Sequence, residues 1–259
     1  MLSCKDRRKE IINLLKINNQ ISIDELVSHF NVTEQAIYRD LNYLEKNNKI
    51  NRTSKGAISS QLDEIQRSLN LNPKESLFIN EKESIAKFTS TLINNGDSLY
   101  IAGSSTTLLL ATNLIDKKRL IVLTNTDRIG SIIKKEKKNR AILIGGHLLK
   151  NTHTTVGKLA GSVISQHKVN KTIIGVHAID IKNGKFYINI KDEVPIMQEM
   201  IKAGSELIIL ADSSKIKNDK NYFICDYTIN KKITLVIDNN ISKEDKTILE
   251  KYNINVITV

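Results

Sequence analysis

The stretch ISIDELVSHFNVTEQAIYRDLNYL, residues 21–44, decides how the chain begins to fold. Ser22 and Glu25 are spaced as a capping box, in which a hydroxyl and a carboxylate each satisfy a backbone N–H at a helix start. Asn31 suits a left-handed turn, and Thr33 can cap a second helix. The stretch therefore predicts two short helices joined by a tight turn.

The second helix, which we expect to reach about Lys46, has two chemically different sides. Ile37, Leu41 and Leu44 recur at i, i+4 and i+7, so one stripe faces a core. The other side can reach base edges or phosphates, because glutamine suits adenine and arginine suits guanine or phosphate. An ordinary solvated helix face is the alternative. We predict a helix-turn-helix, with DNA-binding residues Ser22, Thr33, Gln35, Tyr38, Arg39 and Asn42.

One more helix and a hairpin complete the predicted N-terminal unit. Residues 5–18 place apolar side chains at helical spacing. Two isoleucines flank a short Ser-Lys-Gly turn further on, which favours a small hairpin. Three helices and a hairpin make a winged helix, in which Arg52 and Lys55 would lie beside the phosphate backbone. The predicted DNA-binding domain covers residues 1–58.

Composition and charge narrow the class of protein. The chain has 259 residues and a net charge of +11, which suits a polyanionic partner. Residues 1–60 hold ten basic and seven acidic side chains, so most of the excess lies elsewhere and is diffuse. Two cysteines and five scattered histidines lack the spacing of a disulfide framework or metal site, so we predict no metal and no cofactor. Without an apolar run of ~18–20 residues or a signal peptide, we expect a cytoplasmic protein with no membrane contact.

The middle of the chain reads as a connection. Residues 59–80 are predicted to form a linker, with a short helix indicated by Leu62, Ile65 and Leu69. The next helix is expected to end at Gly96.

Residues 81–259 alternate short β-branched runs with helices, which predicts an α/β domain with a mainly parallel sheet covered on both faces. Ligands of such sheets bind at the carboxyl ends of the strands. The predicted strands are residues 98–103, 119–125, 141–146, 171–176, 206–212, 233–238 and 254–259.

Polar residues and glycines lie at or directly after the carboxyl ends of four of these predicted strands. Hydroxyls, free helix N–H groups and a lysine that converge would make an anion site, and glycines let the backbone approach a ligand closely. Each of these short segments alone could be an ordinary helix cap or turn. Four such segments at four strand ends together predict a ligand pocket. Its expected residues are Ser104, Ser105, Thr106, Thr107, Asn125, Gly145, Gly146 and Lys215.

The N-terminal span resembles the DeoR family of bacterial transcriptional regulators. In that family a helix beginning with Arg precedes Ser/Thr-x-x-Thr-Ile-Arg-Arg-Asp-Leu, and the wing ends in Arg-x-His-Gly-Gly-Ala. The chain departs at Ala36, Tyr38, Ser54 and Lys55, and the departures on the recognition helix concern the operator sequence more than DNA binding itself. It matches at Arg7, Ile11, Leu15, Thr33, Ile37, Arg39, Asp40, Leu41, Arg52, Gly56 and Ala57.

The second half resembles the sensor domain of the same family over nearly its full length. The resemblance implies an α/β fold of the sugar-isomerase and CoA-transferase type and a sugar-phosphate ligand. It places Ser104 to Thr107 and Lys215 on the phosphate, and Asn125, Gly145 and Gly146 along the pocket. The matching segments are Ser104-Ser105-Thr106, Thr124-Asn125, Gly145-Gly146, Gly157 to Ala160 and Ala211 to Lys215.

The sensor half also departs from the family pattern. Ala102 replaces an Asp that would bond sugar hydroxyls, Ser104 replaces a Gly, and Glu193 is the one acid kept from a Glu-x-Glu motif. We therefore include Glu193 in the pocket. Two alternatives stay open: a DNA-binding protein whose α/β domain only oligomerises or takes another ligand, and a phosphosugar isomerase using Glu193, Asp212 and Lys215.

The expected function combines the two halves. We predict a homodimer or homotetramer that binds double-stranded operator DNA through paired recognition helices. It would repress a sugar-catabolism operon until a phosphorylated sugar binds and relieves repression.

Overall fold

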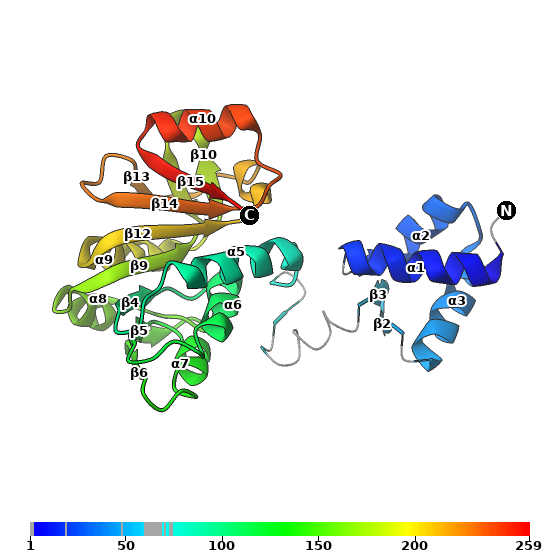
Figure 1. Ribbon diagram of the computed structural model, residues 1–259, viewed down its shortest axis with the longest axis horizontal. Helices are drawn as coiled ribbons and strands as arrows, with labels where there is room; N and C mark the ends of the chain where they lie inside the picture. The colour runs from blue at the N-terminus through cyan, green and yellow to red at the C-terminus, as the bar shows by residue number, and fades with distance from the viewer. Residues whose placement is uncertain (1–2, 19, 48, 60–68, 70, 73–74) are drawn as a thin grey trace. The chain divides into compact units, whose positions relative to one another are not determined.

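The computed structural model describes residues 3–18, 20–47, 49–59, 69, 71–72 and 75–259. The chain divides into two compact units, residues 1–80 and 81–259, each with its own apolar core (Figure 1). The helix predicted around Leu62 and Ile65 lies outside the described residues.

The first unit begins with the three predicted helices, α1 (Cys4–Asn18), α2 (Ile23–Phe30) and α3 (Glu34–Lys46). The capping box that starts α2 is confirmed, because the Ser22 side chain accepts from the Glu25 N–H and the Glu25 carboxylate accepts from the Ser22 N–H. Asn31 is left-handed, with a φ of 49°. The Thr33 hydroxyl accepts from the Ala36 N–H and starts α3, as expected.

The predicted wing is present as β2 (Asn51–Thr53) and β3 (Gly56–Ile58). A further strand, β1 (Gln20–Ser22), pairs antiparallel with β3 and makes a three-stranded sheet of order β1-β3-β2. A Cβ at Gly56 would lie 2.0 Å from the carbonyl oxygen of Ile21, so only glycine permits this approach. The sequence analysis missed β1, because its three residues run directly into α2 and show no period of their own.

The second unit is built on a seven-stranded sheet in which every neighbouring pair is parallel. The strand order is β15-β14-β12-β9-β4-β5-β6, which confirms the expected α/β architecture. The strands are β4 (Ser98–Ile101), β5 (Ile121–Thr124), β6 (Arg140–Leu143), β9 (Val169–Gly175), β12 (Gly204–Ala211), β14 (Lys232–Ile237) and β15 (Ile254–Thr258).

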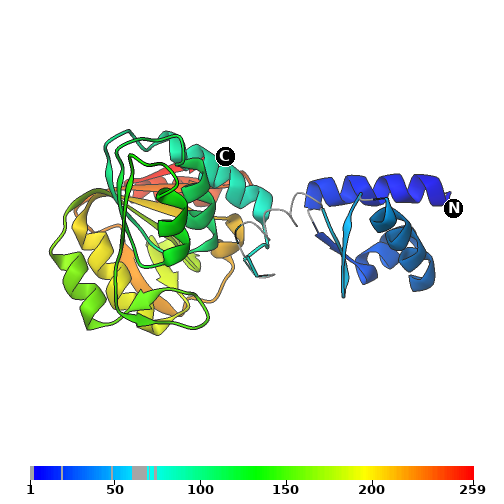
Figure 2. The same cartoon turned by 90° about the horizontal axis from the view of Figure 1, so that it is seen from below.

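Helices cover both faces of this sheet, as Figures 1 and 2 show. On one face lie α5 (Ile79–Thr91), α6 (Ser105–Asn113) and α7 (Asp127–Ile133), and on the other α8 (Lys158–Ser165) and α9 (Val194–Ala203), while α10 (Lys243–Lys251) packs against β15. Buried branched side chains fill the space between the layers.

Helix α5 ends at Thr91, so the expectation that it reaches Gly96 was wrong. The hydroxyls of Ser90 and Thr91 donate to the carbonyls of Lys87 and Phe88. Side chains that bond the backbone locally in this way compete with the helical pattern.

The sequence analysis also missed a second, antiparallel sheet of order β10-β11-β13 and a hairpin of β7 (His147–Leu148) with β8 (Thr155–Val156). The sheet consists of β10 (Ala178–Asp180), β11 (Lys185–Ile188) and β13 (Tyr222–Asp226). These strands have two to five residues, too few for a period to stand out, and β13 finds its partner far back in the chain.

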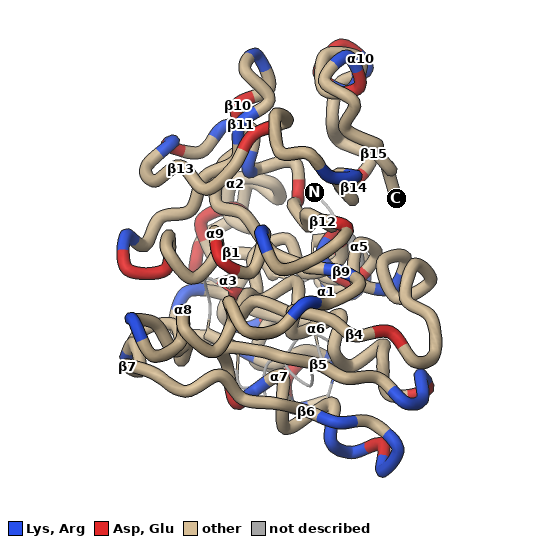
Figure 3. Tube along the Cα trace, turned by 90° about the vertical axis from the view of Figure 1, so that its left-hand side faces the viewer, with Lys and Arg blue, Asp and Glu red and all other residues tan. Residues whose placement is uncertain are grey.

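Charged residues of both signs occur in both units. Lysines and arginines lie among acidic residues at many places along the trace (Figure 3). Within the described residues, no helix is both long and apolar enough to cross a membrane.

Candidate DNA-binding face and effector pocket

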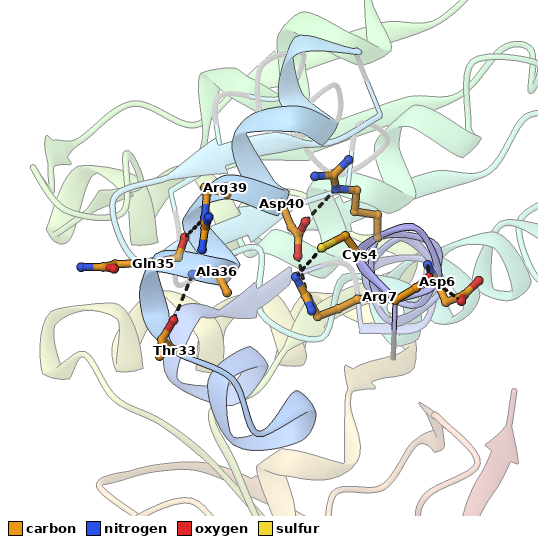
Figure 4. A network of polar contacts seen from close by, with 10 residues as sticks. Cys4, Asp6, Arg7, Thr33, Gln35, Ala36, Arg39 and Asp40 are labelled. Carbon is orange, nitrogen blue, oxygen red and sulfur yellow. Dashed lines mark hydrogen bonds and ion pairs between the residues drawn. The ribbon is translucent and has the colours of Figure 1, made fainter. Parts of the chain in front are cut away.

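The exposed side of α3 carries the side chains predicted to meet DNA. Gln35, Arg39 and Asn42 are exposed, and Tyr38 is 36 % exposed. The Arg39 Nε donates to the Gln35 carbonyl at 3.3 Å, which steadies the guanidinium one turn along the helix (Figure 4). The structure therefore brings these four residues together on one solvent-facing helix side.

The opposite side of α3 is anchored to α1 by an ion-pair cluster that the sequence analysis did not foresee. The Asp40 carboxylate is 1 % exposed and accepts from the Nε of Arg7 at 2.5 Å (Figure 4) and from the Nε of Arg8 at 2.7 Å. Burial opposes the charge of Arg7, but Asp40 raises its pKa overall. Arg7 and Asp40 both belong to the family pattern, and this was the one signal in the sequence that could have suggested the ion pair.

The wing is tied to α3 by Arg52. Its guanidinium donates to the Asn42 side chain and lies over the Tyr38 ring, 5.5 Å from the centroid. Its backbone N–H donates to Glu45 at 3.2 Å. Lys55 is exposed at the tip of the wing.

Two other predicted DNA-binding residues cap helices. The hydroxyls of Ser22 and Thr33 accept the capping hydrogen bonds that begin α2 and α3. Thr33 is exposed and Ser22 is half-buried, so both lie at helix starts where a phosphate could also be met.

At the carboxyl edge of the large sheet, Asn125 joins several loops. Its side-chain oxygen accepts from the Gly103 N–H at 3.0 Å, and its carbonyl accepts from the Thr155 N–H at 2.7 Å. Asn125 is 2 % exposed. It therefore links the ends of β4 and β5 to the β7–β8 hairpin.

Helix α6 starts at this edge with Ser104 as its N-cap. Thr107 completes a capping box, is fully buried, and donates its hydroxyl to the Ala102 carbonyl at 2.6 Å. The side chain of Thr107 therefore holds the loop, and its expected role in effector binding stays a prediction. Ser105 is half-buried and Thr106 is 6 % exposed.

The predicted glycines follow β6. Gly146 has a φ of 155°, and a Cβ there would lie 2.5 Å from the Val156 carbonyl oxygen, so this glycine permits the hairpin to pack closely. A Cβ at Gly145 would meet open space. Of these two predicted glycines, Gly145 is therefore the one that leaves room for a ligand beside the backbone.

Glu193 is buried, 7 % exposed, just before α9. It accepts a hydrogen bond from the Thr154 hydroxyl at 2.6 Å, and Thr154 in turn contacts the Thr152 hydroxyl at 2.6 Å. Burial raises the pKa of Glu193, although both threonines favour the charged form. A Cβ at Gly103 would meet the Thr154 methyl at 2.6 Å, so this cluster adjoins the end of β4. The sequence held no signal for Thr152 or Thr154.

Lys215 lies in the 3₁₀ turn η3 (Ser213–Ile216) after β12. Its Nζ is 3.4 Å from the Asp212 carboxylate. Burial and the positive charge of Lys215 both lower the pKa of His177, which follows β9. The end of β9 is therefore near enough to Lys215 to feel its charge. A Cβ on Gly175 would lie 2.5 Å from the Ser104 Oγ, so the ends of β9 and β4 touch as well.

Thr126 is a residue that the sequence analysis missed. It follows Asn125 directly, is 4 % exposed, and its hydroxyl has no hydrogen-bond partner among the residues that the structure describes. A Cβ built at Gly103 would lie 3.2 Å from the Thr126 Cγ2, so the Thr126 side chain adjoins the end of β4. A buried hydroxyl without a partner costs free energy, and such groups often mark functional sites. The described residues contain no cluster of three His, Cys, Asp or Glu side chains able to hold a metal.

Two family models match this chain in turn. Residues 7–62 match the DeoR-like helix-turn-helix domain, and residues 78–239 match the DeoR C-terminal sensor domain. The chain belongs to the DeoR family. It is a DNA-binding transcriptional regulator with a sensor domain, and the expected recognition and fold are confirmed.

Relatives from other bacteria agree with the DeoR assignment. The uncharacterised HTH-type transcriptional regulator YulB of Bacillus subtilis is 30 % identical over 82 % of this chain and 81 % of its own. The lactose phosphotransferase system repressor of Staphylococcus epidermidis is 28 % identical over 95 % of this chain and 96 % of its own. The glycerol-3-phosphate regulon repressor of Escherichia coli is 30 % identical over 81 % of each chain.

Among solved structures, ribose 5-phosphate isomerase A of Methanocaldococcus jannaschii covers 52 % of this chain and 53 % of its own, at 12 % identity and a TM-score of 0.39. This likeness is too distant to carry an argument about function.

Proposed function

We propose that this DeoR-family protein represses a sugar-catabolism operon and that a phosphorylated sugar relieves the repression. One observation carries the proposal: a chain with an exposed DNA-reading helix also has a sheet edge where the polar Thr126 is buried with its hydroxyl unbonded within the described structure. The relatives that regulate lactose and glycerol-3-phosphate genes point the same way.

The effector would bind at the carboxyl ends of β4, β5 and β12. Positive electrostatic potential for a phosphate would come from two sources. These are the first N–H groups of α6, at Ser105 and Thr106, and the ammonium group of Lys215. The Thr126 hydroxyl and the backbone at Gly145 would meet the sugar. Ser104, Thr107 and Asn125 hold the loops, and Gly146 and Glu193 would complete the surroundings of the ligand.

The DNA would be bound in the cytoplasm by a homo-oligomer that places two recognition helices in successive major grooves. Gln35, Arg39 and Asn42 would contact bases, and Arg52 and Lys55 phosphates. Release requires that the effector bind the DNA-incompetent state more tightly. A ~100-fold preference would contribute about 2.7 kcal/mol.

A second candidate is favoured by Ala102. Its side chain is fully buried and packs in the apolar core of the α/β unit. The polar group with which the family usually meets sugar hydroxyls is therefore missing. In this candidate the α/β unit takes a different ligand or serves oligomerisation alone. An enzymatic role is not proposed, because the relatives are regulators.

A thermal-shift screen against phosphorylated sugars tests the proposal. A ligand that binds only the folded state raises the melting temperature by mass action. We expect one or two hexose or pentose phosphates to raise it, and the unphosphorylated sugars to have no effect. If no member of the panel shifts a protein that still binds DNA, the candidate without sugar-phosphate sensing replaces the first.

A further inference from the structure

The exposed side of α3 is flanked by two arginine–tyrosine pairs. Arg52 from the wing lies over Tyr38, 5.5 Å from the ring centroid, and Arg8 from α1 lies over Tyr43 at 3.9 Å. Residues five apart on a helix are separated by about 140° around the axis. The two tyrosines therefore stand on opposite flanks of the DNA-reading side.

Arg8 is held firmly but is not neutralised. Its Nε donates to Asp40 at 2.7 Å, and the same carboxylate accepts from Arg7 at 2.5 Å. One carboxylate between two guanidiniums leaves one positive charge uncompensated. In the described part of the chain, no hydrogen bond or ion pair occupies the terminal nitrogens of Arg8.

This geometry suits a backbone phosphate. A guanidinium presents a rigid fork of donors that matches phosphate oxygens, and stacking on an aromatic ring fixes its plane. The Arg8 side chain is 26 % exposed and Tyr43 is 50 % exposed, so both can reach a ligand. Because Arg8 is already ordered by Asp40 and Tyr43, little side-chain entropy would be lost on binding.

We propose that Arg8 and Tyr43 bind a DNA backbone phosphate on the flank of α3 opposite the wing. The inference rests on the proposed DNA-binding function and adds α1 to the contact surface. Arg52 and Tyr38 make the corresponding contact on the wing side, so the recognition helix is bracketed by phosphate contacts.

The test is the salt dependence of DNA binding by the full-length chain. Fluorescence anisotropy with a labelled duplex of mixed sequence needs no knowledge of the operator, because phosphate contacts are sequence-independent. Each lost phosphate contact lowers the slope of log Kd against log salt by about 0.9. For Arg8→Ala we expect that loss of slope and a Kd about five-fold weaker near ~0.15 M salt.

Two further variants separate a phosphate contact from other effects. Arg8→Lys keeps the charge and is expected to keep most of the slope. Lys9→Ala removes one charge at the next, exposed position of α1 and is expected to leave the slope near the wild-type value. Arg7 still pairs with Asp40 in every variant, so circular dichroism melting is expected to show a folded winged helix.

Several outcomes would overturn the proposal. A weaker Kd with an unchanged slope would mean that Arg8 acts only by supporting Asp40. An equal slope change in Arg8→Ala and Lys9→Ala would mean a diffuse charge effect. Normal wild-type binding with no change in Arg8→Ala overturns this inference alone, whereas failure of the wild-type protein to bind any duplex overturns the proposed function with it.

Discussion

A buried carboxylate in the winged helix unit and a buried hydroxyl in the α/β unit differ in the partners that the structure gives them. In the first, the buried Asp40 carboxylate has two guanidinium partners at hydrogen-bond distance. In the second, the Thr126 hydroxyl is buried with no partner among the described residues, and the raised pKa of Glu193 shows a carboxylate in a poorly solvating site. A satisfied network stabilises a surface that is ready to bind, whereas an incompletely satisfied edge is one that a ligand can complete.

The largest effect is expected from breaking the satisfied network. Asp40→Ala leaves the buried Arg7 guanidinium without a counter-charge, which costs about 3–5 kcal/mol. Urea denaturation followed by circular dichroism should show an early transition of the winged helix, while the α/β transition is unchanged. A loss below about 1 kcal/mol would mean that the pair is as weak as an exposed one.

At the carboxyl edge of the large sheet, Lys215→Ala is expected to abolish the effector response. The stabilisation by ligand at about 100 times Kd, about 2.7 kcal/mol, should disappear, because the ammonium that meets the phosphate is gone. Thermal shift with the active sugar phosphate measures the loss, and DNA binding without effector is the control. A full response would remove Lys215 from the pocket.

On the DNA-reading side, Arg39→Ala is expected to weaken operator binding ten-fold or more, which corresponds to about 1.4 kcal/mol or above. Arg39 is exposed, and within the described residues its side chain bonds only the Gln35 carbonyl, so the melting temperature should stay the same. Anisotropy titrations with a duplex selected from a random library give the comparison. Unchanged affinity would contradict the assignment of α3 as the recognition helix.

A substitution at Thr126 sharpens the contrast between the units. Thr126→Val replaces an unbonded buried hydroxyl by a methyl of similar size, so we expect the free protein to be equally stable or stabilised by up to ~1 kcal/mol. The same substitution should weaken binding of the effector, because the ligand then lacks a hydrogen-bond partner at this position. Destabilisation of the free protein, seen by thermal melting, would show that the hydroxyl already has a structural role.

The smallest effect is expected from Glu193→Gln. Burial raises the pKa of Glu193 above its ordinary value of 4.5, so its contribution to stability is present below that pH and is lost as the pH rises through the folded-state pKa. The glutamine variant should lack this loss, since its side chain still accepts from Thr154 and carries no charge. Melting temperatures across pH ~4 to 8 give the test. Parallel pH profiles for the two proteins would contradict a raised pKa.

Much of the fold was predictable because its signals are local. The capping box of Ser22 and Glu25, the turn at Asn31 and the stripe from Ile37 to Leu44 lie within a few residues of one another. Strands of the parallel sheet were recognisable where they contain a run of apolar residues, as in β12 and β14.

Other features depend on residues far apart in the sequence. The β10-β11-β13 sheet and β1 consist of strands too short to show a period. Thr154 reaches Glu193 across 39 residues, and Arg7 reaches Asp40 across 33. No local pattern encodes such a pairing, because the partners meet only when the whole unit has folded.

The sequence by itself determined the two-part organisation, the winged helix, the parallel sheet and the strand ends where polar residues gather. Tertiary structure alone decided which of those residues are free to act. It made Thr107 a buried side chain that bonds the Ala102 carbonyl, and it placed Arg8 on the Tyr43 ring beside α3. It also buried the Thr126 hydroxyl with no partner among the described residues. The physical reason is that residue type and spacing specify backbone conformation, whereas burial and hydrogen-bond partners depend on how distant segments pack.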